Sequence, residues 1–189
     1  MDGASRYLQD VDDEHREVVL EDGTVTLRPF RSSDVDVYVR EQDQAMLDGF
    51  EWDGPATTES VSAACARWTE SWQVGGPERN FAIIDSRSAE LVGDCEVEAR
   101  HDGYANVMYV VFAPWRGCGV ATRAAQLLLA YATRELPDHI PLFRVDPTNL
   151  ASMAVARRCG ATPEGEEVSA KGRALTRLVV RRHPTLPNP

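Results

Sequence analysis

The sequence lacks several features that would assign a protein to a class at once. Its cysteines, Cys65, Cys95, Cys118 and Cys159, are widely spaced and form no C-x-x-C pair, which argues against a zinc site and a disulfide framework. No apolar run reaches the roughly 18 residues of a membrane span, and the polar N-terminus lacks the apolar segment of a signal peptide. We therefore expect a cytoplasmic protein with reduced cysteines, no metal and no membrane partner.

Basic residues are also scarce, with 20 Lys and Arg against 30 Asp and Glu and a net charge of −10. Phosphates would be repelled, so a nucleic-acid partner is disfavoured. The imbalance is strongest in residues 1–22, which hold eight acidic residues and two arginines. This run is typical of a solvated, partly disordered segment, and the alternative interpretation is attraction of a cationic substrate such as an amine.

The chain length of 189 residues predicts one domain with a substantial core. We expect a flexible acidic segment over residues 1–15, a single domain over 16–183 and a short tail over 184–189.

Hydrophobic periodicity and turn residues predict the element order ββ-αα-βββ-α-β-α-ββ. Hairpins are interspersed with helices, so we expect an α+β fold with a mixed sheet. The expected elements are a hairpin at 17–28 turning at Asp22-Gly23, helices at 34–47 and 57–74, strands at 80–84, 91–98 and 106–113, a helix from 122, a strand at 142–145, a helix at 150–159 and a hairpin at 162–182.

Residues 106–132 join a strand, a glycine turn and a helix, and the rest of the chain is organised around them. Pro114 cannot donate a ladder hydrogen bond and should end the strand. Gly117 and Gly119 let backbone N–H groups converge at a helix N-terminus, which predicts an anion site with phosphate as the expected anion. Val120-Ala121 follows in place of the Lys-Ser/Thr of a P-loop, and a third glycine is missing, so two nucleotide-binding motifs are disfavoured.

Four segments resemble one family. RGCGVA at 116–121 is similar to the Arg/Gln-x-x-Gly-x-Gly/Ala signature of the Gcn5-related N-acetyltransferase (GNAT) superfamily, and VVFAPW at 110–115 resembles its fourth strand. NLAS at 149–152 with RCGA at 158–161, and TVTLRPF at 24–30, resemble its ribosomal-protein-alanine acetyltransferase branch. The resemblance implies a mixed, mostly antiparallel sheet that splays between the family's strands four and five and is flanked by about four helices.

The resemblance implies an acetyl-CoA-dependent N-acetyltransferase in which an amine attacks the thioester directly in a ternary complex. Loop amides would hold the cofactor's pyrophosphate, and the strand edge would pair with its pantetheine arm. A backbone N–H near Val111 would stabilise the oxyanion, a contribution of about a hundredfold in rate. The implied cofactor-binding residues are Tyr109, Val110, Val111, Phe112, Arg116, Gly117, Cys118, Gly119, Val120, Ala121, Thr122, Asn149 and Ser152.

A base is needed because only the neutral amine attacks. One usual position of the family's carboxylate, at the start of its fourth strand, holds Asn106 in this chain. Alternation in strand 91–98 places Val92 with Asp94, Glu96 and Glu98 on one face, and clustered carboxylates raise one another's pKa. We therefore expect Glu96 to be the base, with Glu98 second, and a merely solvated strand face is the alternative.

Two other acidic or polar sets are relevant to the reaction. Glu164, Glu166 and Glu167 lie in the last hairpin, where the ribosomal-protein branch also uses an acid, but the register is open. Many family members protonate the leaving thiolate with a tyrosine seven residues after Asn149, and here that position is Ala156. Ser152 is the remaining candidate for a donor to the sulfur, and an ordinary first-turn helix serine is the alternative.

The acceptor amine should approach along the first two helices and the last hairpin. Trp52 and Asp53, in a loop before Gly54-Pro55, are candidates for acceptor recognition, together with Glu98. Trp68 and Trp72 have helical spacing and are expected in the core.

Acids in the cleft would favour a cationic amine, which could be a protein N-terminus, an antibiotic, a polyamine or a metabolite. The missing tyrosine and carboxylate equivalents leave a second class open, a non-catalytic acyl-CoA-binding regulatory module. The resemblance makes a homodimer a reasonable expectation.

Overall fold

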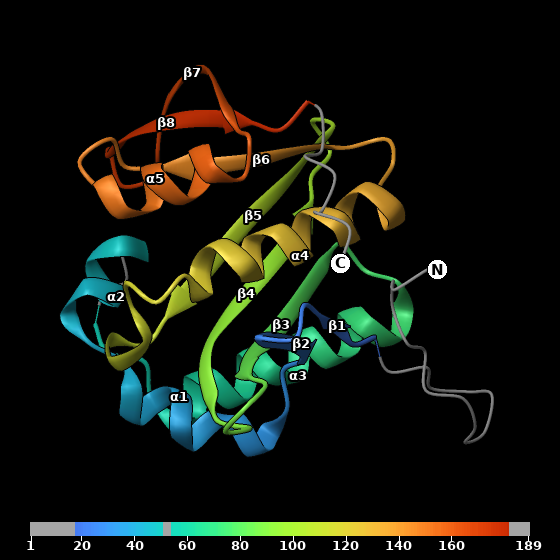
Figure 1. Ribbon diagram of the computed structural model, residues 1–189, viewed down its shortest axis with the longest axis vertical. Helices are drawn as coiled ribbons and strands as arrows, with labels where there is room; N and C mark the ends of the chain where they lie inside the picture. The colour runs from blue at the N-terminus through green and yellow to red at the C-terminus, as the bar shows by residue number, and fades with distance from the viewer. Residues whose placement is uncertain (1–17, 51–53, 182–189) are drawn as a thin grey trace.

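The computed structural model describes residues 18–50 and 54–181, which form one eight-stranded sheet with helices on both faces (Figure 1). The strand order is β1-β2-β3-β4-β5-β6-β8-β7, and the only parallel pair among these strands is β5 with β6. The predicted α+β fold with a mixed, mostly antiparallel sheet is confirmed. Five α-helices lie in the described residues, where about four were expected.

The chain begins with the expected hairpin of β1 (Leu20–Glu21) and β2 (Val25–Pro29). Its turn is held by Asp22, whose carboxylate accepts hydrogen bonds from the backbone N–H groups of Thr24 and Val25, both at 2.9 Å. A 3-10 turn at Ser32–Asp34 follows, and Asp34 forms a two-pronged ion pair with Arg28 at 2.7 Å for each contact. This pair joins β2 to the first helix.

The helix predicted at 34–47 is wrong in one respect, because the chain forms two helices there. α1 (Val35–Glu41) and α2 (Gln44–Phe50) are separated at Gln42, whose backbone is extended with φ −64° and ψ 145°. The Gln42 side chain bonds the backbone of Ala56 through both its oxygen and its nitrogen, each at 2.7 Å. This non-local contact ends α1, and helical periodicity could not predict it.

α3 (Thr58–Val74) has the predicted bounds. The backbone N–H of Ser60 donates to the Thr57 side chain at its start, and Gly75 adopts a left-handed conformation at its end. Trp68 and Trp72 are partly buried against the two cores, as expected.

The central antiparallel strands are β3 (Glu78–Asp85), β4 (Leu91–Ala99) and β5 (Tyr104–Val111). The chain then passes through a short 3-10 turn (Ala113–Trp115) into α4 (Val120–Glu135), β6 (Ile140–Val145) and α5 (Leu150–Arg158). The hairpin of β7 (Thr162–Val168) and β8 (Ala174–Val179) closes the sheet. None of the helices in the described part of the chain is both long and apolar enough to cross a bilayer.

Two cores lie on opposite faces of this sheet. One contains Phe81, Val107 and Phe143 with the apolar residues of α4 and α5. The other contains Ala82, Val110 and Phe112 with residues of α1, α2 and α3. Each central strand therefore has one face toward α4 and α5 and the other toward α1, α2 and α3. Side chains of β5 that alternate along the strand consequently lie in different cores.

A register shift corrects one predicted face. Ile83 pairs with Gly93 and Ile84 with Leu91, so Val92 is an extra residue in β4. Val92 consequently joins the core under α4, while Leu91 packs on the other core, which exchanges the faces expected for these two residues. Asp94, Glu96 and Glu98 lie beyond the shift and share a face as expected.

Candidate active site

β5 has an open main-chain edge over its C-terminal half. Its pairing with β6 ends at Asn106–Leu142, and the two strands diverge from there (Figure 1). The N–H of Phe112 donates to the carbonyl of Val92 in β4 at 2.9 Å. Because successive backbone groups of a strand point to alternate edges, those of Tyr109 and Val111 point toward the side from which β6 has diverged. This edge can accept an extended ligand as an additional strand.

The glycine loop, residues 116–119, lies between this edge and the first turn of α4. Gly117 and Gly119 have φ values of 77° and 84°, a region that glycine adopts without strain. None of the backbone N–H groups of residues 117–119 donates to another described residue. The first turn of a helix adds further unbonded N–H groups and the positive end of the helix dipole, so the loop can hold an anion.

Arg116 connects the glycine loop to the strand edge and to α2. Its Nε donates to the carbonyl of Val111 at 2.8 Å, and its two terminal nitrogens bond the Asp43 carboxylate at 2.6 and 2.9 Å. Arg116 holds the pKa of Asp43 below its usual range. Asp43 also accepts from the N–H of Met46 in the first turn of α2, at 3.1 Å. Arg116 thus uses three of its five N–H groups within the protein and keeps two for a ligand.

The face of the sheet toward α1 and α3 carries a set of polar residues that we call the acidic face. Strand pairing brings Asn80 opposite Glu96, and Glu78 opposite Glu98, with Asp94 one step further along β4. Burial, with smaller contributions from neighbouring carboxylates and first among them Glu78, raises the pKa of Glu96 to about 7. Because Glu96 remains partly exposed, it has the pKa and the access that a base needs at neutral pH.

Asp94 and Asn80 are the buried members of the acidic face. Asn80 Nδ2 donates to Asp94 Oδ2 at 3.1 Å. Burial raises the pKa of Asp94 to about 7, against a smaller opposing effect of Asn80. Neither residue was predicted to have a role of its own, although the alternation of β4 already placed Asp94 beside Glu96.

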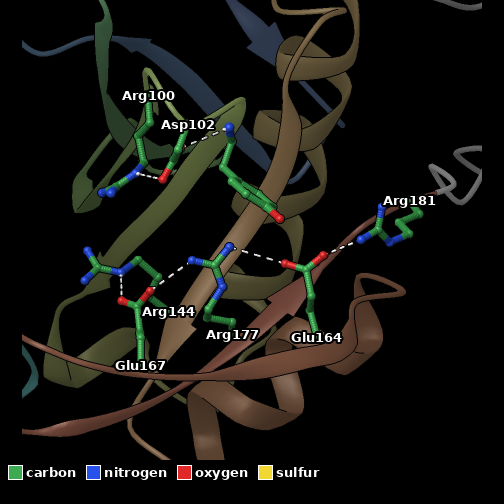
Figure 2. Close-up of polar contacts among 8 residues, drawn as sticks. Arg100, Asp102, Arg144, Glu164, Glu167, Arg177 and Arg181 are labelled. Carbon is green, nitrogen blue, oxygen red and sulfur yellow. Dashed lines mark hydrogen bonds and ion pairs between the residues drawn. The ribbon is translucent and has the colours of Figure 1, made fainter.

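The carboxylates of the last hairpin have a different environment (Figure 2). Glu164 bonds Arg177 at 3.3 Å and also pairs with Arg181, while Glu167 bonds Arg177 at 3.1 Å and pairs with Arg144. Hydrogen bonds from Tyr104 and Arg177 lower the pKa of Glu164. A carboxylate held ionised by arginines is a weak base, so the hairpin offers a poorer candidate than Glu96.

The start of α5 faces β5 from the side of the sheet that is opposite the acidic face. Asn149 caps this helix, its side-chain oxygen accepting from the N–H of Ser152 at 3.0 Å. The Tyr109 hydroxyl is buried and forms no hydrogen bond of good geometry with a described residue. Ser152 nevertheless lies near enough to moderate the pKa of Tyr109, which burial raises to about 12. The sequence interpretation used only the backbone of Tyr109, whereas the strand alternation could have placed its side chain toward α5.

Gly93 is a further residue that the sequence interpretation missed. A Cβ atom on Gly93 would lie 2.1 Å from the carbonyl oxygen of Val110. The close approach of β4 to β5 therefore requires glycine at this position. Only the three-dimensional pairing reveals that requirement.

The remaining predicted site residues fall into three groups. Val120, Ala121 and Thr122 form the first turn of α4, and Cys118 is exposed in the glycine loop. Glu98 lies on the acidic face opposite Asn106. Trp52 and Asp53 lie outside the described residues.

A comparison with protein families matches residues 24–162, more than half of the chain, to the acetyltransferase (GNAT) domain. The chain belongs to the GNAT acetyltransferase family. It is accordingly an enzyme that transfers acetyl groups, and the superfamily and fold indicated by the sequence segments are confirmed.

Solved acetyltransferase structures share the fold at low sequence identity. RimL, a ribosomal L7/L12 alpha-N-protein acetyltransferase in complex with coenzyme A, has a TM-score of 0.76 and 19% identity over 86% of this chain and 97% of its own. Mycobacterium smegmatis RimJ, in complex with CoA-disulfide, has a TM-score of 0.71 and 23% identity over 87% and 86% of the chains. Spermidine N-acetyltransferase from Vibrio cholerae, in complex with CoA and spermine, has a TM-score of 0.71 and 18% identity over 84% and 96%. A search of curated protein sequences finds no match.

Proposed function

We propose that this GNAT protein transfers the acetyl group of acetyl-CoA to a primary amine by direct attack in a ternary complex. The observation that carries the proposal is the open edge of β5 beside the glycine loop at the start of α4. An extended thiol-bearing arm followed by a pyrophosphate matches that arrangement of backbone donors and acceptors. The CoA complexes of RimL and RimJ, which share the fold, support the same cofactor.

In this proposal the cofactor contacts mostly main-chain groups. Residues 109–112 pair with the pantetheine arm, residues 116–122 hold the pyrophosphate, and Asn149 binds the amide of the arm. The N–H of Val111 faces the thioester carbonyl and stabilises the oxyanion. Arg116 donates to the carbonyl of the same residue at 2.8 Å, which belongs to the next peptide unit, so it restrains the backbone on the C-terminal side of this N–H.

Glu96 accepts the proton of the attacking amine. Glu96 pairs with Met108, three residues from Val111 along β5. A strand rises ~3.3 Å per residue, which separates these positions by about 10 Å along the strand. The proton therefore travels through water between the amine and Glu96. The nitrogen forms the new bond to the carbonyl carbon, the C–S bond breaks, and the thiolate leaves.

Tyr109 and Ser152 stabilise the leaving thiolate by hydrogen bonding. A thiol has a pKa near 8.5, well below the pKa of about 12 of Tyr109, so the tyrosine keeps its proton and acts as a donor. Tyr109 approaches from β5 and compensates for Ala156, which stands at the position of the family's usual tyrosine. Ser152 lies beside it in α5.

The acceptor is a protein N-terminus or a small-molecule amine. The carboxylates of Glu78, Glu96 and Glu98 would attract a cationic amine to the acidic face. RimL acts on a protein α-amine and the Vibrio cholerae relative was solved with a polyamine, so both classes are represented among proteins of this fold.

The test is release of CoA from acetyl-CoA in the presence of a panel of amines. The panel would contain N-terminal peptides beginning with Ala or Ser, polyamines, aminoglycosides and amino acids. We expect CoA release with at least one member, together with a mass increase of one acetyl group on that amine. Tight acetyl-CoA binding without turnover of any member would instead support a regulatory module.

A further inference from the structure

The pair of Asn80 and Asp94 contains two buried oxygen atoms without hydrogen-bond partners. The residues are 1% and 8% exposed, and one bond joins them, from Asn80 Nδ2 to Asp94 Oδ2 at 3.1 Å. Asn80 Oδ1 and Asp94 Oδ1 are fully buried and accept no hydrogen bond from a described residue. Both atoms are acceptors when Asp94 is ionised, so the pair is short of a donor.

A proton on Asp94 would supply that donor. A carboxylic acid and a carboxamide can form two hydrogen bonds side by side, one from the amide N–H and one from the acid O–H. The acid proton would lie on Oδ1 and be donated to Asn80 Oδ1, so both unpaired oxygens would be satisfied together. Burying a neutral, paired group costs much less than burying an ion with an unpaired oxygen.

The charges around Asp94 act in the same direction. Glu96 and Glu98 share its strand face, Glu78 lies on β3, and Tyr38 of α1 is packed near enough to Asp94 and Glu96 for their charges to raise its own pKa. No cation is among the groups that shift the pKa of either carboxyl. Among the described residues, no group of three or more His, Cys, Asp or Glu could hold a metal ion. The negative charge on this face is therefore reduced most readily by a proton.

Of the two neighbouring carboxyls, Asp94 is the better place for this proton. Asp94 is buried and bonded to Asn80, whose oxygen has no partner, whereas Glu96 is partly exposed and its charge is better solvated. We propose that Asp94 holds a proton in the resting enzyme, forms a neutral hydrogen-bonded pair with Asn80, and thereby leaves Glu96 as the ionised carboxylate. Asp94 is then a positioning residue that sets the charge of its neighbour.

The protonation of Asp94 is inferred from the geometry of the Asn80–Asp94 pair. Its consequence for catalysis rests on the proposed function. Two ionised carboxylates side by side would raise each other's affinity for protons, and one would be neutralised. A neutral Asp94 lets Glu96 remain ionised and able to accept the amine proton. In this way Glu96 can lie beside another acidic residue and still carry the negative charge that a base needs.

The first test compares the thermal stability of Asp94→Asn with that of the natural protein as a function of pH. The pKa of Asp94 rises from 3.8 to about 7 on folding, so the folded protein binds more protons than the unfolded chain between these values. Its stability therefore falls as the pH rises through this window, and the loss is complete above pH 7. An asparagine can make both hydrogen bonds to Asn80 but does not titrate.

We expect the melting temperature of Asp94→Asn, relative to the natural protein, to rise by on the order of 5 °C between pH 4 and pH 8. Glu90→Gln, which removes an exposed carboxylate just before β4, is the control for the change in net charge. The proposal would be overturned if the difference in melting temperature between Asp94→Asn and the natural protein stayed constant from pH 4 to pH 8.

The second test needs no substrate, and its main measurement is made on the natural protein. Infrared difference spectra between pH 6 and pH 9 should contain a protonated-carboxyl band that disappears at the higher pH. Labelling aspartate with 13C assigns the band to this residue type, and Asp94→Asn should lack it. Absence of an aspartic acid band at pH 6 would show that another donor, such as water, satisfies the two oxygens, and would refute the proposal.

The catalytic consequence is tested by the pH profile of kcat/KM with an accepted amine. If Asp94 is neutral in the natural enzyme, replacing it with asparagine does not change the charge next to Glu96. The fall of kcat/KM at acid pH, which reports protonation of Glu96, should therefore occur at the same pH in Asp94→Asn. A shift of this fall by one pH unit or more toward acid would identify Asp94 as the ionised member and Glu96 as the proton holder. If no amine is acetylated, the proposed function fails, while stability and infrared spectra still decide the protonation of Asp94.

Discussion

The two sides of β5 differ in which atoms they offer. On the cofactor side, defined by the open edge of residues 109–111 and the glycine loop, the backbone supplies most of the groups that can contact a ligand. On the acceptor side, defined by the acidic face, carboxylates and an amide from β3 and β4 supply them. A main-chain site constrains few residue types, mainly glycine, whereas a side-chain site depends on residues brought together from separate strands.

Arg116 joins the cofactor side to α2, which packs on the same face of the sheet as the acidic face. It contacts the main chain of Val111 on the cofactor side and the carboxylate of Asp43 at the start of α2. α2 is also held at Asp48, whose carbonyl accepts from Arg173 in the turn between β7 and β8, at 2.6 Å. A substitution on the cofactor side should therefore change the kinetics for acetyl-CoA, and one on the acceptor side the kinetics for the amine. A substitution at Arg116 or Asp43 should change the kinetics for both substrates.

The largest effect is expected for Glu96→Gln, which alters the acceptor side alone. Loss of a general base costs about 10²- to 10⁴-fold in kcat/KM. With a pKa of about 7 for Glu96, activity of the natural enzyme should fall below pH 7 as the base becomes protonated. Steady-state kinetics across pH 5–9 should show that the variant has lost this limb and retains the limb set by the amine.

Acetyl-CoA affinity of Glu96→Gln, measured by calorimetry, should remain that of the natural protein. An unaltered rate at pH 7 would exclude Glu96 as the base. A large loss of acetyl-CoA affinity would show that the two sides are not separate.

The next effect is expected for Gly119→Val on the cofactor side. Gly119 has φ 84°, and a β-branched residue there costs about 1–3 kcal/mol. Relief of that strain would turn the loop amides away from the pyrophosphate and weaken acetyl-CoA binding by about 10- to 100-fold, as measured by calorimetry.

Gly103→Val is the matched control for Gly119→Val. Gly103 has φ 82° in the turn before β5, with no atom near its missing Cβ, as at Gly119. It should lose a similar amount of stability but keep its acetyl-CoA affinity. Equal affinity losses in the two variants would mean that general destabilisation, rather than the loop, accounts for the result.

A smaller effect is expected for Tyr109→Phe. Loss of a hydrogen bond to the departing thiolate costs ~1.5 kcal/mol, or about tenfold in kcat, with little change in the Kd of acetyl-CoA. Rapid-quench measurement of the chemical step is the appropriate assay. Ser152→Ala serves as the comparison, and a drop for Ser152→Ala without one for Tyr109→Phe would assign the donor to Ser152 alone.

The smallest effect is expected for Arg116→Lys, which keeps the charge but cannot form the two-pronged contact with Asp43. The pair is about a third exposed on each side, at 37% and 33%, so solvent limits its contribution to about 1 kcal/mol or less. We expect kcat/KM to fall about twofold to fivefold for both substrates.

Asp43→Asn should reproduce the Arg116→Lys effect if the link matters. A defect confined to acetyl-CoA in Arg116→Lys, with none in Asp43→Asn, would show that Arg116 acts on the pyrophosphate and not as a link between the sides.

Local patterns predicted most of the fold. Asp22-Gly23 predicted a hairpin, Gly75 ended α3 and Asn149 capped α5, because each depends on bonds within a few residues. The predictions that failed depend on distant partners. Gln42 broke a predicted helix through a bond to Ala56, and an extra residue in β4 opposite Ile83–Ile84 exchanged the faces of Leu91 and Val92.

The sequence by itself indicated the family and the position of the glycine loop, because glycines at 117 and 119 and a proline at 114 restrict the backbone wherever they occur. Only the tertiary structure decided which carboxylates have a raised pKa and which are ion-pair partners with a lowered one. Glu96 and Glu164 are equivalent as residue types, yet burial among acids raises the pKa of one and hydrogen bonds from Tyr104 and Arg177 lower that of the other. A side chain's proton affinity depends on its surroundings, and those surroundings are assembled from strands far apart in the chain.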